Sequence, residues 1–126
     1  MKRQMNEIIT PAMVEQKLRS LSKEVDEAHK TLIEIESTYH ASKAHYEIEM
    51  AKARMKYATQ SSPTGKNYTV GEREDKALID CAPLHEDIAI FQAQVLAARA
   101  NTNRLKMQVD IIRSVGTSVR TSMDLT

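Results

Sequence analysis

Residues 84–115 read LHEDIAIFQAQVLAARANTNRLKMQVDIIRSV, and this stretch decides the fold of the chain. Its apolar and small side chains return in alternating steps of four and three residues, the heptad spacing of helices that pack lengthwise on one another. We therefore expect a long helix over 83–115. The members of this row are Leu84, Ile88, Phe91, Val95, Ala98, Thr102, Leu105, Val109 and Ile112.

An equal heptad row fills the first half of the chain and predicts a helix over 11–59. Thr10 offers an N-cap oxygen, and Pro11 stands where the missing N–H of proline is harmless, so the helix is expected to begin there. After Tyr46 a step of three becomes a step of four, a stutter that locally unwinds a coiled coil. The members of this row are Val14, Leu18, Leu21, Val25, Ala28, Leu32, Ile35, Tyr39, Ser42, Tyr46, Met50, Ala53 and Tyr57.

The segment between the two rows is polar and predicts a loop over 60–68, because it carries Ser, Pro, Gly and Asn without periodicity. A short helix over 69–80 follows, since Thr69 and Glu72 have the spacing of a capping box. Pro83 disfavours helix at the residue before it, which predicts a short break between the second and third helices.

Gly116 is a natural helix stop, so we expect the last helix to end there and residues 116–126 to form a tail or a short helix. Two apolar rows joined by a polar loop predict one all-α domain over 1–126. Its fold is a long, coiled-coil-like antiparallel helical hairpin with a short helix in between. Because a two-helix hairpin has little core, we expect copies of the chain to assemble and complete it.

The balance of charge favours no class of partner, because 18 Lys and Arg stand against 17 Asp and Glu. Cys81 is the single cysteine, which excludes an internal disulfide and fits a reducing cytoplasm. Residues 1–10 lack the apolar core of a signal peptide, and no run approaches the ~18 apolar residues that span a bilayer. We therefore expect a cytoplasmic protein with no membrane contact.

A second apolar face on the helix over 83–115 indicates self-association, because its alanines permit close approach of another helix. The residues assigned to this face are Ile90, Ala93, Ala97, Ala100, Met107 and Ile111.

Basic residues gather in two places. Residues 50–71 contain four cations and no acid, and two tyrosines there offer rings on which bases stack. A second set recurs every seven residues and forms a stripe along one side of a helix. Each set has two interpretations. It binds along a phosphate backbone, or it forms a solvated flank of a coiled coil that pairs with acids of a partner helix. The first set is Lys52, Arg54, Lys56 and Lys66 with Tyr57 and Tyr68, and the stripe is Arg99, Lys106, Arg113 and Arg120.

Catalytic chemistry has no candidate residues, because no nucleophile elbow, phosphate-binding loop, dinucleotide fingerprint or zinc-protease motif is present. Cys81 and His85 lie four residues apart, but no second Cys/His pair stands nearby, so a half-buried thiol is expected rather than a metal site. We expect no enzyme, no cofactor and no metal.

The order of elements over 39–120 resembles the UvsY-type recombination mediators of phages. The resemblance rests on a long helix ending in Lys52, Arg54 and Tyr57, a polar loop, the stretch TVGERE at 69–74, an acidic break, and a long helix closing on a glycine. It implies a non-enzymatic homo-oligomer that binds single-stranded DNA and helps a recombinase displace the single-strand-binding protein. A phage-encoded chain of this kind is expected in the cytoplasm of the host cell. The implied DNA-binding residues are the four cations of residues 50–71. The implied assembly segment is 111–123, which contains Val115 and Val119.

Three functions follow from these observations. The leading one is an accessory protein of recombination or replication that contacts single-stranded DNA and a recombinase or single-strand-binding protein. The first alternative is a protein-interaction module without nucleic-acid binding, such as a phage inhibitor of a host or defence protein or a coiled-coil adaptor. The second is a structural or scaffold subunit.

Overall fold

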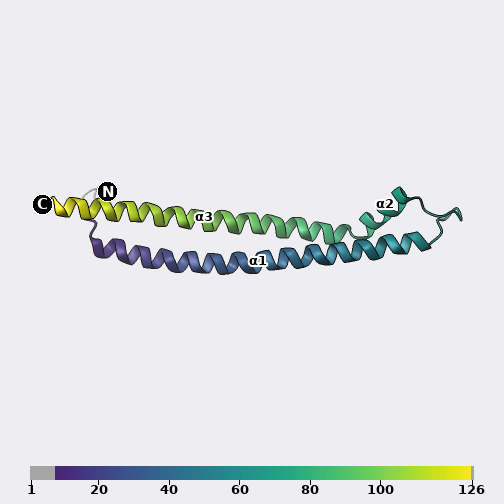
Figure 1. Ribbon diagram of the computed structural model, residues 1–126, viewed down its shortest axis with the longest axis horizontal. Helices are drawn as coiled ribbons and strands as arrows, with labels where there is room; N and C mark the ends of the chain where they lie inside the picture. Colours follow the sequence, from purple (N-terminus) through teal and green to yellow (C-terminus); the bar gives the residue numbers. More distant parts are fainter. Residues whose placement is uncertain (1–7, 126) are drawn as a thin grey trace, which may run out of the picture. The chain divides into compact units, whose positions relative to one another are not determined.

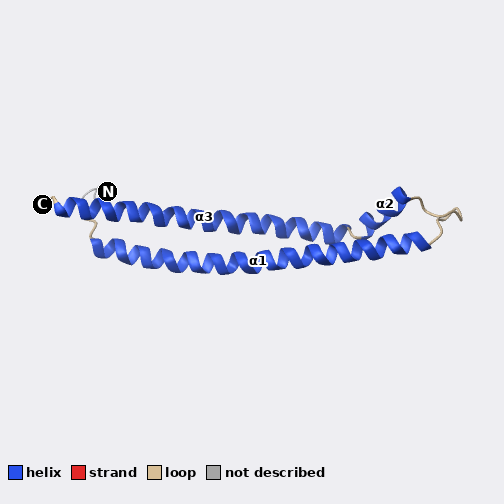
Figure 2. Cartoon of the chain, in the orientation of Figure 1, coloured by secondary structure: helices blue, strands red, loops and turns tan. Residues whose placement is uncertain are grey.

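The computed structural model describes residues 8–125, and over these residues it contains three helices and no strand (Figures 1 and 2). Helix α1 spans Pro11–Thr59, helix α2 spans Val70–Asp80, and helix α3 spans Ala82–Asp124. The two long helices run antiparallel and pack closely, with the short helix between them in the chain. This arrangement confirms the predicted all-α helical hairpin.

The described chain divides into two compact units. Unit 1 pairs residues 8–32 with residues 98–125, and unit 2 consists of residues 33–97. The single domain that the sequence predicts stays a prediction, and each unit is described by itself below.

The core of unit 1 lies where the two heptad rows meet. Leu21 is only 1% exposed and packs in a cluster with Ala28 and Leu105. Thr102 is the polar member of the row on α3, and it is buried. Its hydroxyl donates a hydrogen bond of 3.0 Å to the carbonyl of Ala98, which satisfies the polar group inside the core.

The prediction that Gly116 ends the last helix is wrong, because α3 continues through it to Asp124. Gly116 is buried, and a Cβ atom added to it would lie 3.0 Å from Cγ1 of Val14 on α1. The alternating spacing also continues from Ile112 to Gly116 and on to Val119. Glycine here is therefore a member of the heptad row that lets α1 and α3 approach closely.

The core of unit 2 is shared by α1, α2 and the junction between α2 and α3. Met50 and Ala53 of α1 pack with Ala77 of α2 and with Cys81, and Tyr46 lies against this cluster. This end of α1 is therefore covered by the short helix.

The signals for the starts of α1 and α2 in the sequence are confirmed. The hydroxyl of Thr10 accepts a hydrogen bond of 3.2 Å from the amide of Met13 at the start of α1. Thr69 and Glu72 form a reciprocal capping box at the start of α2. The break before α3 is shorter than predicted, because Cys81 alone separates the helices.

The expectation that Pro83 keeps Ala82 out of the helix is wrong, because Ala82 is the first residue of α3. The carbonyl of Cys81 accepts a hydrogen bond from the amide of His85, so α3 starts directly at the junction. Pro83 lies in the first turn, where the N–H that proline lacks has no partner within the helix.

Candidate association surface and polar tip

The clearest unfilled surface is an apolar groove in unit 1, and none of the side chains that line it is charged. We call it the unit 1 groove. It lies between Ile8 and Ile9, which precede α1, and the last part of α3. It continues into a neighbouring groove that shares Ile9 and Val115 with it. The unit 1 groove is lined by Ile8, Ile9, Ile111, Ser114, Val115, Ser118, Val119, Ser122 and Met123.

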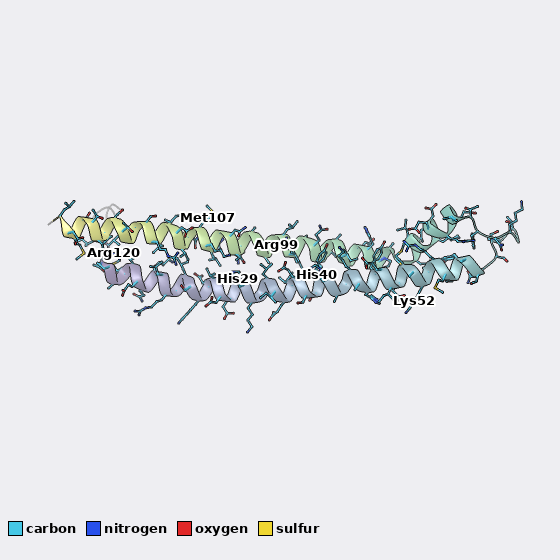
Figure 3. All side chains as sticks on the ribbon, viewed as in Figure 1. His29, His40, Lys52, Arg99, Met107 and Arg120 are labelled. Carbon is cyan, nitrogen blue, oxygen red and sulfur yellow. The ribbon has the colours of Figure 1, made fainter. Side chains whose placement is uncertain are left out.

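The structure brings together only part of the predicted association face. Ile111 is 58% exposed in the unit 1 groove, and Met107, 64% exposed, lies one turn before it on the side of α3 away from α1 (Figure 3). Val115 and Val119 are half-buried members of the groove. Of the other predicted residues, Ile90, Ala93 and Ala97 are exposed in unit 2 and Ala100 is exposed in unit 1, and none of them lines the groove.

Sequence reasoning missed three serines of the groove. Ser114, Ser118 and Ser122 are spaced four residues apart and share its wall with Ile111 and Met123. The sequence contains this four-residue spacing, but Ser118 and Ser122 follow Gly116, where the last helix was expected to end. These small side chains leave room for another helix to approach α3 closely.

Arg54, one of the predicted DNA-binding residues, holds a carboxylate of α2. Its guanidinium donates two hydrogen bonds to Glu74, with Nε at 2.7 Å from Oε2 and Nη2 at 3.0 Å from Oε1. This pairing lowers the pKa of Glu74 and raises that of Arg54. A two-point pair of this kind fixes orientation as well as charge, so it sets how α2 lies on α1.

Lys56 and Tyr57 converge on a second carboxylate of α2. The hydroxyl of Tyr57 donates a hydrogen bond of 2.7 Å to Oδ2 of Asp80, and this bond raises the pKa of the tyrosine. The ammonium of Lys56 lies 3.8 Å from the same oxygen. We call residues 50–81 the tip. Two of the four predicted DNA-binding cations at the tip are therefore paired with acids of α2.

The expectation that the two tip tyrosines offer rings for base stacking is corrected by their burial. Tyr57 is 9% exposed and Tyr68 is 8% exposed. Their rings pack edge to face, with centroids 5.7 Å apart and planes at 88°. Because each ring fills space beside the other, neither presents an open face in this structure.

The other two tip cations do not join a common track. Lys52 lies on the side of α1 away from α2 (Figure 3), and its ammonium is 3.4 Å from a carboxylate oxygen of Glu49. Lys66 is exposed on the loop. Residues on a helix are ~100° apart around its axis, so Lys52 and Lys56 lie on one side of α1 and Arg54 lies on another.

The stripe of basic residues on α3 lies among acids in unit 1. Lys106 and Arg113 line one groove together with Asp26 and Asp110. Arg113 is 3.9 Å from Asp110, and both side chains are exposed. The Nε atom of Arg120 donates a weak hydrogen bond of 3.4 Å to the carbonyl of Gly116.

Arg99 also takes part in an interaction within the protein. The stripe is thus a flank of mixed charge rather than a continuous basic track.

Cys81 behaves as a core residue. It is 4% exposed, and its burial raises the pKa of the thiol. The ring of His85, the other member of the pair, lies 5.6 Å from the ring of Tyr46. Among residues 8–125, no group of three or more His, Cys, Asp or Glu is arranged to hold a metal ion. Within the same range, no helix has an apolar stretch long enough to cross a membrane.

The fold and these surfaces define an all-α hairpin with an uncovered apolar groove and a helix fastened by ion pairs. Comparison with known protein families, curated proteins and solved structures finds no match for this chain.

The carboxylates that fasten α2 predict an acid-sensitive tip. Hydrogen bonds with Arg54 lower the pKa of Glu74, and bonds from the backbone and hydroxyl of Thr69 lower that of Glu72. A carboxylate with a lowered folded pKa stabilises the fold above its unfolded pKa of about 4.3, and this contribution is lost as the pH falls through the folded value. We therefore expect α2 to loosen below about pH 4, before unit 1 does.

NMR spectra of labelled protein, recorded from pH 7 to pH 2, measure this order of events. The amide signals of α2 should change at higher pH than those of the unit 1 core. Glu74→Gln should weaken the pH dependence, because the ionisable partner of Arg54 is gone. Simultaneous loss of both sets of signals would contradict the prediction.

Proposed function

We propose that this protein is a non-enzymatic interaction module that associates with copies of itself through the unit 1 groove. The observation that carries the proposal is the uncharged apolar lining of that groove, with Ile111 more than half exposed at its wall. Contiguous apolar surface of this kind typically marks a protein–protein interface. The assembled hairpins would then present their outer surfaces to other proteins, as an adaptor or scaffold does.

A second copy is the occupant that suits the groove best. A lining without charge offers nothing to a partner selected by charge, and it creates no like-charge repulsion between two identical faces. A two-fold dimer places the same patch on both subunits, so such a face can be complementary to itself. The serines of α3 allow the close helix approach that this arrangement needs.

The mass of the protein in solution tests this proposal. Light scattering after gel filtration should give a multiple of the chain mass of 14.2 kDa at micromolar concentration, and the mass should decline on dilution. A mass of one chain throughout the micromolar range would refute self-association.

The accessory role in recombination that the resemblance implies is the rival proposal, and the ion pairs at the tip weigh against it. Arg54 and Lys56 already face carboxylates of α2, so a DNA phosphate would have to displace them. We expect fluorescence anisotropy to show weak binding to labelled oligothymidine at low salt and none at physiological salt. Tight binding that declines steeply with salt would instead favour the recombination role, because it reports phosphate contacts.

A further inference from the structure

The end of α1 in unit 2 presents a face on which a helix packs. An apolar row runs along its centre, formed by Tyr46, Met50, Ala53 and Tyr57. Arg54 and Lys56 stand on opposite sides of this row, because helix residues are ~100° apart around the axis. We call these six residues the tip groove.

Helix α2 shows what kind of ligand the tip groove accepts. Ala77 and Cys81 lie four residues apart on one face of the chain and are 0% and 4% exposed against α1. Glu74 reaches Arg54 on one side, and Asp80 reaches Tyr57 and Lys56 on the other. The ligand is a short helix with two small anchors and one carboxylate on each side of them.

We propose that the tip groove is a binding site for a short acidic amphipathic helix of a partner protein, and that α2 occupies this site in cis. Helix-in-groove recognition uses apolar anchors at spacings of three and four residues, and Ala77 of α2 and the C-cap residue Cys81 are four residues apart. The apolar row favours a helix over a nucleic acid, because a phosphate backbone carries no apolar anchors. This site is separate from the unit 1 groove and does not depend on self-association.

The contacts of α2 are suited to exchange. The helix has 11 residues, fewer than the ~12–15 that an isolated helix needs to be even marginally stable in water. Its ion pairs lie at the surface, with the side chains of Arg54 and Glu74 49% and 44% exposed. A partner helix with the same pattern makes the same contacts when it replaces α2.

The covalent link between α1 and α2 makes the tip groove of the unaltered protein hard for a free helix to occupy. Because α2 is joined to α1 by a short loop, its effective concentration at the groove is on the order of millimolar. A free peptide therefore binds the unaltered protein poorly. The binding site becomes measurable in a full-length variant whose own α2 no longer fits.

The decisive experiment frees the tip groove by reversing the two anchoring charges. The full-length variant Glu74→Lys with Asp80→Lys, which we call the freed variant, places cations opposite Arg54 and Lys56. It is titrated into a fluorescein-labelled synthetic peptide of residues 68–82 under reducing conditions. The matched control is Asp75→Lys with Glu86→Lys, which changes the net charge equally at exposed residues. Fluorescence anisotropy should show at least about tenfold tighter peptide binding to the freed variant than to the control or the wild type.

Two further measurements make each outcome decisive. A peptide with lysine in place of both Glu74 and Asp80 should not bind the freed variant. Circular dichroism should show that α1 and α3 of the freed variant remain helical. If the freed variant loses its helices, the milder pair Glu74→Gln and Asp80→Asn replaces it in the same titration. Equal peptide affinity for freed and control proteins would overturn the proposal. Binding of labelled oligothymidine in place of the peptide would also overturn it and would assign the groove to a polyanion.

Discussion

Ile111→Glu is expected to reduce the protein in solution to single chains of 14.2 kDa at concentrations where the wild type is larger. Ile111 stands in the wall of the unit 1 groove and is 58% exposed, so a carboxylate there meets water in the separate chain. In an assembly that covers the groove, the same carboxylate is buried without a cation among the groove residues. An unpaired buried charge costs several kcal/mol, and each ~1.4 kcal/mol weakens association tenfold, so the loss should be about 100-fold or more.

Thr117→Glu is the matched control for this variant. Thr117 is exposed on α3 and does not line the unit 1 groove. A glutamate there changes the net charge equally and lies one turn from both Arg113 and Arg120. The control should therefore keep the wild-type mass in light scattering. An Ile111→Glu protein that also keeps this mass would show that another surface holds the assembly together.

Gly116→Leu is expected to destabilise unit 1, although leucine is the better helix former. A Cβ atom at this position would already lie 3.0 Å from Cγ1 of Val14, and a leucine adds three more carbon atoms in the same direction. Inserting atoms into a packed core typically costs about 1–3 kcal/mol, which exceeds the gain of about 1 kcal/mol from removing a helical glycine. Thermal and urea unfolding followed by circular dichroism measure the difference.

Two comparisons isolate the cause of this effect. Gly71→Leu makes the same exchange in α2, where an added Cβ meets nothing within 4 Å, and it should leave stability unchanged or slightly raised. Combining Gly116→Leu with Val14→Ala removes the atom that clashes and should restore part of the lost stability, a coupling that independent sites do not show. If the single Gly116→Leu variant is as stable as the wild type, close approach at this point does not limit the packing of α1 on α3.

The sequence by itself determined the helices and their buried rows, because these depend on neighbours in the chain. The bounds of α1 follow from Thr10, Pro11 and the polar loop, and the start of α2 follows from its capping box. Heptad spacing identified the buried sides of both long helices, since every predicted member of the two rows is buried or half-buried. Periodicity succeeds here because a helix turns by a fixed angle per residue.

Only the tertiary structure decided which charges are paired and which apolar faces stay open. Arg54 meets Glu74 twenty positions further along the chain, and no local pattern announces that pairing. Packing between the same distant segments buries Tyr57 and Tyr68 against each other. Gly116 reads as a helix stop in the sequence but serves close helix packing, because its role depends on Val14 from the other end of the chain. Contacts between distant segments are set by how the helices dock, and that docking paired Arg54 and Lys56 with acids of α2.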